Sequence, residues 1–177
     1  VICRGDVKIG FSNPNDDPCG YRAQMVIYLS SLHYDKPTLY NDLVVDHTAI
    51  TVTQNEENYT INVPEDLEID TDKIVVRSAE IDLVTLLEMG EIDYLFIYSS
   101  IVRQHEDMGV MEIDLPPEVD LSDIEHAMEY ARIKVKLANG DVTTGKPIVY
   151  GATIPINAPH PSEAEAFLLY ILSTEGR

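Results

Sequence analysis

Several residue types that commonly build functional sites are scarce in this sequence. The 177 residues include no tryptophan, two cysteines and five histidines. Two cysteines are too few for a disulfide framework, so we expect two separate buried thiols, although one bridge between Cys3 and Cys19 stays open. The histidines show no metal-ligand spacing, which argues against a zinc site. Without tryptophan, the aromatic platform common in sugar sites is missing, which argues against a glycosidase.

Positive charge and long apolar runs are also scarce. The chain has 12 Lys and Arg residues against 31 Asp and Glu residues, and its formal net charge is −19. Binding to phosphate backbones or to anionic membrane surfaces needs clustered Lys and Arg, so neither kind of partner is expected. No run of about 18 apolar residues is present, so no membrane span is predicted. The sequence lacks a starting Met and a signal peptide, and we therefore expect a fragment or processed form.

The hydrophobic pattern predicts strands that alternate with helices, which places the chain in the α/β class. Residues 7–12 form a predicted strand that leads through a polar loop into a helix capped by Asp17. Residues 73–77 and 92–98 are predicted strands, and the helix between them is expected to be capped by Ser78. Such a βαβ unit implies that its two strands are parallel.

The rest of the chain continues this alternation. A polar turn between two alternating stretches predicts a β-hairpin within residues 49–63. A capping box at Ser162–Glu165 opens a predicted last helix. The apolar face that this helix should bury comprises Phe167, Leu168, Ile171 and Leu172. Further strands are predicted at 110–115, 132–137 and 147–156, and short helices at 99–105 and 122–130.

Three polar side chains stand where predicted parallel strands end or the following helices begin. They are Asp17, Glu80 and Tyr98. In open α/β sheets, ligands lie outside the carboxyl ends of the strands, so these side chains can converge although they are distant in sequence. The helix that begins at Pro18 offers unpaired N–H groups and a positive dipole end to an anion. Gly20 keeps its first turn slim, and Arg22 adds positive charge nearby.

Each of these residues also has an ordinary structural interpretation. Asp17 can act as a plain helix cap, and Glu80 can compensate a helix dipole, as can Asp82. Tyr98 can be an amphipathic core residue. No nucleophile elbow, P-loop or dinucleotide fingerprint is present. An enzyme that uses Asp17 and Glu80 as acid and base is supported only by the pair of carboxylates.

Several segments, in order and over nearly the whole chain, resemble signatures of the molybdate/tungstate-binding proteins of archaeal-type ABC importers. The first is the longest and most specific. The segments are Phe11–Arg22, Val76–Leu83, Tyr94–Ser100 with Gln104 and His105, Gly145–Pro155 with Asn157–Pro159, and Leu172–Gly176. The resemblance implies one lobe of a type II periplasmic-binding-protein fold, with a mixed, mostly parallel sheet flanked by helices.

The resemblance also implies a function. Proteins of this family are extracellular, membrane-anchored solute-binding components that pass tungstate or molybdate to an ABC permease and need no cofactor. By position, Asp17 and Glu80 would approach the metal of the bound oxyanion directly. Tyr98 would donate a hydrogen bond to an oxo group. The backbone around Pro18, Cys19 and Gly20 would hold another oxo group.

The resemblance further implies how the chain divides. Residues 1–145 would form the second, ligand-binding lobe, with the hairpin at 49–63 as an insertion. Residues 146–177 would form a return strand and a C-terminal helix, which normally pack on a first lobe that this chain lacks. The chain would then hold half a site, and exposed apolar surface would favour self-association. An oxyanion-sensing domain of a transcription regulator with the same fold stays open as an alternative.

Overall fold

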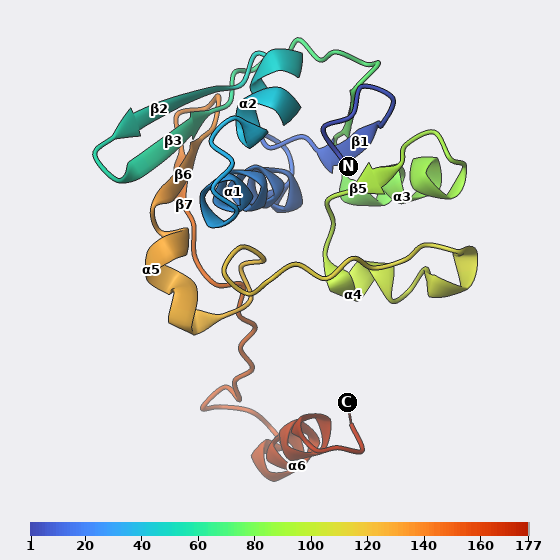
Figure 1. Cartoon of the computed structure of the whole chain (residues 1–177). Helices are drawn as coiled ribbons and strands as arrows, with labels where there is room; N and C mark the ends of the chain where they lie inside the picture. The colour runs from blue at the N-terminus through green and yellow to red at the C-terminus, as the bar shows by residue number, and fades with distance from the viewer. Residues whose placement is uncertain (177) are drawn as a thin grey trace. The chain divides into compact units, whose positions relative to one another are not determined.

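The computed structural model describes residues 1–176, with only the backbone of Glu106. The chain forms two compact units, Val1–Pro147 and a second that begins at Ile148 (Figure 1). The first unit holds two sheets flanked by helices, which confirms the predicted α/β class. No helix within residues 1–176 combines the length and the apolar character that a bilayer span requires. That the second unit packs on another lobe stays a prediction.

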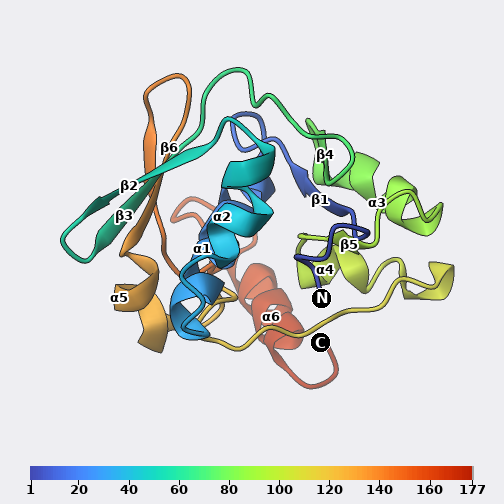
Figure 2. The same ribbon diagram turned by 45° about the horizontal axis from the view of Figure 1, so that its top comes forward.

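The first sheet contains three parallel strands. Strand β1 (Ile9–Ser12) lies between β4 (Ile74–Arg77) and β5 (Tyr94–Leu95) (Figure 2). All four residues of β1 are buried. Helix α3 (Glu80–Glu88) connects β4 to β5, so the predicted βαβ unit is present with β1 inserted between its strands. Because the strands are parallel, their carboxyl ends meet at one edge of the sheet.

The second sheet has the strand order β2-β3-β6-β7. Strands β2 (Thr51–Asn55) and β3 (Asn58–Asn62) form the predicted hairpin, and β6 (Ile133–Lys136) pairs with β7 (Val142–Thr144) in a second antiparallel pair. The two pairs are joined by parallel contact between β3 and β6. The sheet is therefore mixed, and the first sheet is entirely parallel.

Helix α1 (Pro18–His33) connects the two sheets. It packs against β1, β6 and the short helix α2 (Leu39–Leu43), which the turn η1 (Val45–His47) follows. Nine of its residues are buried, more than the single apolar stripe of a surface helix would provide. Because α1 is buried on several sides and contacts β1, its N-terminus lies at the end of β1.

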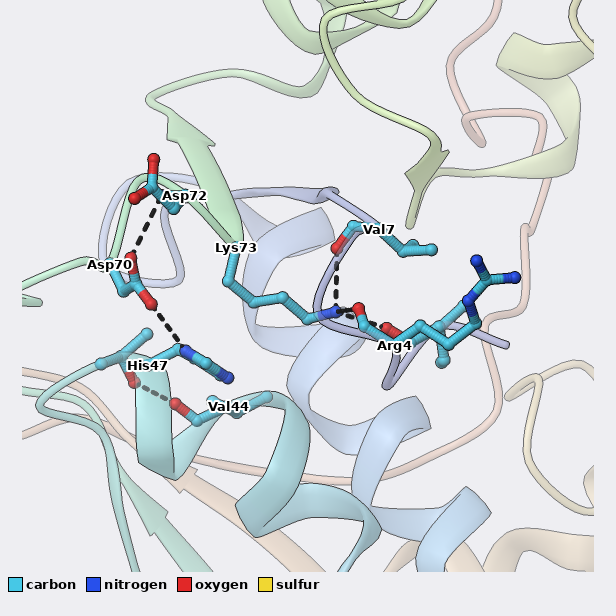
Figure 3. A network of polar contacts seen from close by, with 9 residues as sticks. Arg4, Val7, Val44, His47, Asp70, Asp72 and Lys73 are labelled. Carbon is cyan, nitrogen blue, oxygen red and sulfur yellow. Dashed lines mark hydrogen bonds and ion pairs between the residues drawn. The ribbon is translucent and has the colours of Figure 1, made fainter.

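A buried lysine holds the first residues of the chain against the start of β4. Lys73 is 3% exposed, and its ammonium donates to the carbonyl oxygens of Ile2, Arg4 and Val7 at 2.7, 2.6 and 2.8 Å (Figure 3). A buried ammonium is tolerated only when it is hydrogen-bonded in this way. The residues held in this way, 2–6, form turns and bends.

Three predicted strands are wrong in whole or in part. Residues 92–98 contain only the two-residue strand β5, and neither 110–115 nor 147–156 forms a strand. Apolar alternation provides a face to bury, but a strand also needs a hydrogen-bonded neighbour. The segment 110–115 pairs with none of the described strands, and Met111 within it is 87% exposed.

The predicted short helices are present but shorter. Helix α4 occupies part of the helix predicted at residues 99–105. The helix predicted at residues 122–130 is instead a 3-10 turn followed by one helical turn. A further 3-10 turn lies between them. These elements are α4 (Ser99–Val102), η2 (Glu106–Met108), η3 (Ile124–His126) and α5 (Ala127–Tyr130).

The last helix, α6 (Pro161–Leu172), differs from the prediction at its start and on its face. The helix begins at Pro161, and His160 before it provides no side-chain cap. Proline suits the first helical position because it has no N–H group that would need a partner there. The predicted capping box is therefore wrong. None of its residues is buried, and Phe167 and Leu172 are 62% and 66% exposed. The second unit by itself is too small to cover that apolar face.

Both cysteines are free thiols, so the bridge that the sequence left open does not form. Cys19 is buried, as predicted, whereas Cys3 is exposed in the N-terminal turns.

Candidate functional site

The carboxylate of Asp17 lies where two helices begin. As the predicted N-cap of α1, it accepts the N–H of Cys19 through Oδ1 at 2.9 Å. Its Oδ2 accepts the N–H of Glu80, the first residue of α3, at 3.2 Å. The predicted cap of α3 by Ser78 is wrong, because the helix starts after Ala79 and has no cap from its own chain segment. One carboxylate therefore joins two helix N-termini.

The carboxyl groups of Asp17 and Glu80 lie close enough to share a proton. Burial is the strongest single influence on Asp17 and raises its pKa. The Glu80 carboxyl, the Cys19 N–H and the nearby Ser12 hydroxyl each lower the pKa, and together they outweigh burial, so the pKa of Asp17 lies below its usual 3.8. The contact with Asp17, helped by burial, raises the pKa of Glu80 above its usual 4.5. The two opposite shifts therefore favour Glu80 over Asp17 as the place of a proton on the pair.

Tyr98 reaches the same edge of the sheet from beyond β5, at the N-cap position of α4. Its hydroxyl oxygen accepts a hydrogen bond from Nη1 of Arg22, on the first turns of α1. The Arg22 guanidinium carbon also lies 5.6 Å from the ring centroids of both Tyr21 and Tyr98, within the range of cation–π attraction. Burial raises the pKa of Tyr98 to about 12, so its hydroxyl keeps its hydrogen.

The thiol of Cys19 ties the start of α1 to the segment after β5. Its Sγ lies 3.7 Å from the carbonyl oxygen of Phe96, the distance of a weak thiol hydrogen bond. Burial, assisted by the negative charges of Asp17 and Glu80, raises the pKa of Cys19 to about 12. The side chain therefore stays a neutral thiol and has a packing role.

Gly20 allows the first turn of α1 to approach the end of β1 closely. A Cβ atom at this position would lie 2.1 Å from the carbonyl oxygen of Ser12 and 2.8 Å from backbone atoms of Asn13 and Pro14. Pro18 occupies the first position of the helix and is exposed. The glycine thus places the helix N-terminus directly against the loop that follows the strand.

The N–H groups predicted to hold an oxo group have partners within the loop. The Asp17 N–H donates to the Asn13 carbonyl, and the Gly20 N–H donates to the Asp17 carbonyl, both at 3.0 Å. The Cys19 N–H donates to the Asp17 carboxylate, and Pro18 has no N–H. A bound oxyanion would receive these donors only after a local rearrangement of the loop.

Sequence reasoning did not select one polar residue of the site, Ser12. It is fully buried at the end of β1, and its hydroxyl makes no hydrogen bond of normal geometry. The hydroxyl is nevertheless close enough to Asp17 and Cys19 to lower the pKa of both. A serine that ends an otherwise apolar strand was the only signal in the sequence. A buried hydroxyl without a partner is uncommon and points to a site whose contacts are incomplete.

The structure therefore brings Asp17, Glu80 and Tyr98 to one edge of the first sheet. Comparison with known proteins identifies the group to which the chain is similar. The family described as bacterial extracellular solute-binding protein matches residues 2–177.

The relatives of this chain include an uncharacterized solute-binding protein of Methanococcus aeolicus. It is 40% identical over 173 residues, which cover 97% of this chain and 49% of that protein. A second, from Methanococcus maripaludis, is 43% identical over 97% of this chain and 52% of its own length. The molybdate/tungstate-binding protein WtpA of Thermococcus kodakarensis is 39% identical over 100% of this chain and 48% of its own length. The chain thus spans about half the length of these curated relatives. With its match to the family extending over residues 2–177, the chain belongs to the bacterial extracellular solute-binding proteins.

Proposed function

We propose that this chain is one lobe of a solute-binding protein that captures tungstate or molybdate between two lobes. The observation that carries the proposal is the meeting of the Asp17 and Glu80 carboxyl groups at the N-termini of α1 and α3. The molybdate/tungstate-binding relative, at 39% identity, supports the choice of ligand. The protein binds its ligand and catalyses no reaction, as the description of the family suggests.

Two carboxylates suit a metal centre that arrives with ligands of its own. Among the side chains that the structure describes, no group of three or more His, Cys, Asp or Glu is arranged to hold a bare metal ion. Hexavalent tungsten and molybdenum are hard centres that accept carboxylate oxygen, and each carries oxo groups already. Asp17 and Glu80 would expand this coordination from one side.

The charge of the site needs compensation, because two carboxylates beside a dianion repel it. The N-termini of α1 and α3 supply positive potential at the point where the carboxylates lie, and Arg22 adds a full charge nearby. Sulfate has a centre with no room for further ligands. The carboxylates would therefore repel sulfate without bonding to it, and the site would select for the larger oxyanions.

The remaining contacts complete the proposal. The Tyr98 hydroxyl, which keeps its hydrogen, would donate to an oxo group. The other lobe would supply further donors. We place the protein outside the cell, held at the membrane and delivering its ligand to an ABC permease.

Isothermal titration calorimetry on the full-length protein tests this function. Tungstate and molybdate should bind tightly and sulfate should not. Changing a residue that supports a metal ligand costs about 10–100-fold in affinity, so Asp17→Asn and Glu80→Gln, which change the ligands themselves, should each cost about a hundredfold or more. Asp82→Asn is the matched control, because Asp82 is exposed in the same first turn of α3. Equal binding by both site variants and the parent, or binding of sulfate as tight as that of tungstate, would refute the proposal.

A further inference from the structure

We propose that Arg22 is the residue that positions Tyr98 for the oxyanion, by donating a hydrogen bond to the phenol oxygen and leaving the hydroxyl hydrogen for an oxo group. This inference rests on the proposed function and adds a positioning residue to it. It starts from the contact between Nη1 of Arg22 and the hydroxyl oxygen of Tyr98, which joins α1 to the N-cap position of α4 across 76 residues of sequence.

The direction of the contact follows from the chemistry of the two groups. A guanidinium has only donors, so the Tyr98 oxygen must accept. The single hydrogen of the hydroxyl is then left over. Among the residues that the structure describes, no acceptor takes a hydrogen bond from the Tyr98 hydroxyl. The described protein groups thus leave this hydrogen available, and a ligand oxygen could accept it.

The contact also fixes the position of the ring. The Arg22 guanidinium carbon lies 5.6 Å from the ring centroids of Tyr21 and Tyr98. The two rings restrain the guanidinium, and the guanidinium in turn restrains the ring of Tyr98. Both Arg22 and Tyr98 are partly buried, which limits competition from water. A phenol already held in place loses little conformational freedom when a ligand binds, and a hydroxyl that accepts from a cation becomes a stronger donor.

Arg22 has a second way to act, as a simple positive charge. Its charge is felt at the start of α1, where it lowers the pKa of Cys19 against the stronger effects of burial and the carboxylates. Both roles predict that removing Arg22 weakens oxyanion binding. They differ in whether the loss depends on Tyr98.

A double-mutant cycle on tungstate affinity separates the two roles. Arg22→Gln and Tyr98→Phe should each weaken binding about tenfold, the size expected for one charge-assisted hydrogen bond. If Arg22 acts through Tyr98, the double variant should bind no more weakly than Tyr98→Phe alone. If the two losses multiply, Arg22 acts as an independent charge and the positioning role is refuted. Arg103→Gln removes the same charge from an exposed residue after α4 and should change affinity less than about twofold.

Tyrosine-selective carbon-13 NMR on the ligand-free protein examines the contact without any oxyanion. The signal of Tyr98 is the one missing from Tyr98→Phe, and Arg22→Gln should shift it while Arg103→Gln should not. An unshifted signal would refute the positioning role, whatever the affinities. If the parent bound no oxyanion, the proposed function would be refuted and the positioning role with it. Normal tungstate binding without coupling would refute the positioning role alone.

Discussion

Substituting alanine for Gly20 directly tests how closely α1 must approach the end of β1. The added Cβ would lie 2.1 Å from the Ser12 carbonyl oxygen and 2.8 Å from backbone atoms of Asn13 and Pro14. All three atoms belong to the main chain, so no side-chain rotation can relieve the contact. The helix start or the loop must move instead, by about 1 Å or more to reach a normal separation of about 3.5 Å.

The expected cost can be assembled from three contributions. Alanine in a helix is otherwise favoured over glycine by about 0.5–1 kcal/mol. Overpacking of a rigid position costs about 1–3 kcal/mol and occasionally more, and a main-chain clash belongs at the upper end. The shift also disturbs the Asp17 cap, worth about 1 kcal/mol. We therefore expect Gly20→Ala to lower the free energy of unfolding by about 2–3 kcal/mol.

Urea denaturation followed by circular dichroism measures this change, with the slope of the transition reported beside the midpoint. Gly5→Ala is the matched control, because nothing lies within 4 Å of a Cβ atom there. That variant should stay within about 0.5 kcal/mol of the parent. If Gly20→Ala were equally neutral, the close packing between the start of α1 and the end of β1 would be disproved, and with it the placement of Asp17.

Two further predictions concern the charged groups. Glu80→Gln should change how the stability of the ligand-free protein depends on pH. The raised pKa of Glu80 means that the folded parent holds a proton that the unfolded chain has lost, so parental stability falls as pH rises from about 4.5 through the folded pKa. The variant should lack this fall, which we expect to be less than about 1 kcal/mol because the pair is partly screened. If the urea midpoints of parent and variant changed equally between pH 4 and 8, the raised pKa of Glu80 would be disproved. Lys73→Met should lower the free energy of unfolding by about 1–3 kcal/mol, since water can replace the ammonium at the exposed turns but the carbonyl of buried Val7 stays unsatisfied. Hydrogen exchange should show opening of residues 1–7, and a parent-like exchange pattern would count against this anchoring.

The sequence by itself determined the features that depend on near neighbours. Alternation and the polar turn predicted the hairpin of β2 and β3, and the Asp17-Pro18 pair predicted where α1 begins. Repeated strands and helices predicted the α/β class. These signals are local because a cap, a turn and a hydrophobic period each act within a few residues. Their positions at the ends of predicted strands selected Glu80 and Tyr98, but those positions left their ordinary roles open. The resemblance to a known family supplied the roles as oxyanion ligands.

Only the tertiary structure decided the features that depend on distant partners. Sequence reasoning expected Ser78 to cap the start of α3. In the structure the N–H of Glu80 at that start donates to the carboxylate of Asp17, 63 residues away. The apolar alternation of 110–115 predicted a strand that finds no neighbour among the described residues. The burial of Ser12 and the contact between Arg22 and Tyr98 are likewise products of packing. Hydrogen-bond partners and burial are properties of the folded chain, so residues distant in sequence decide them.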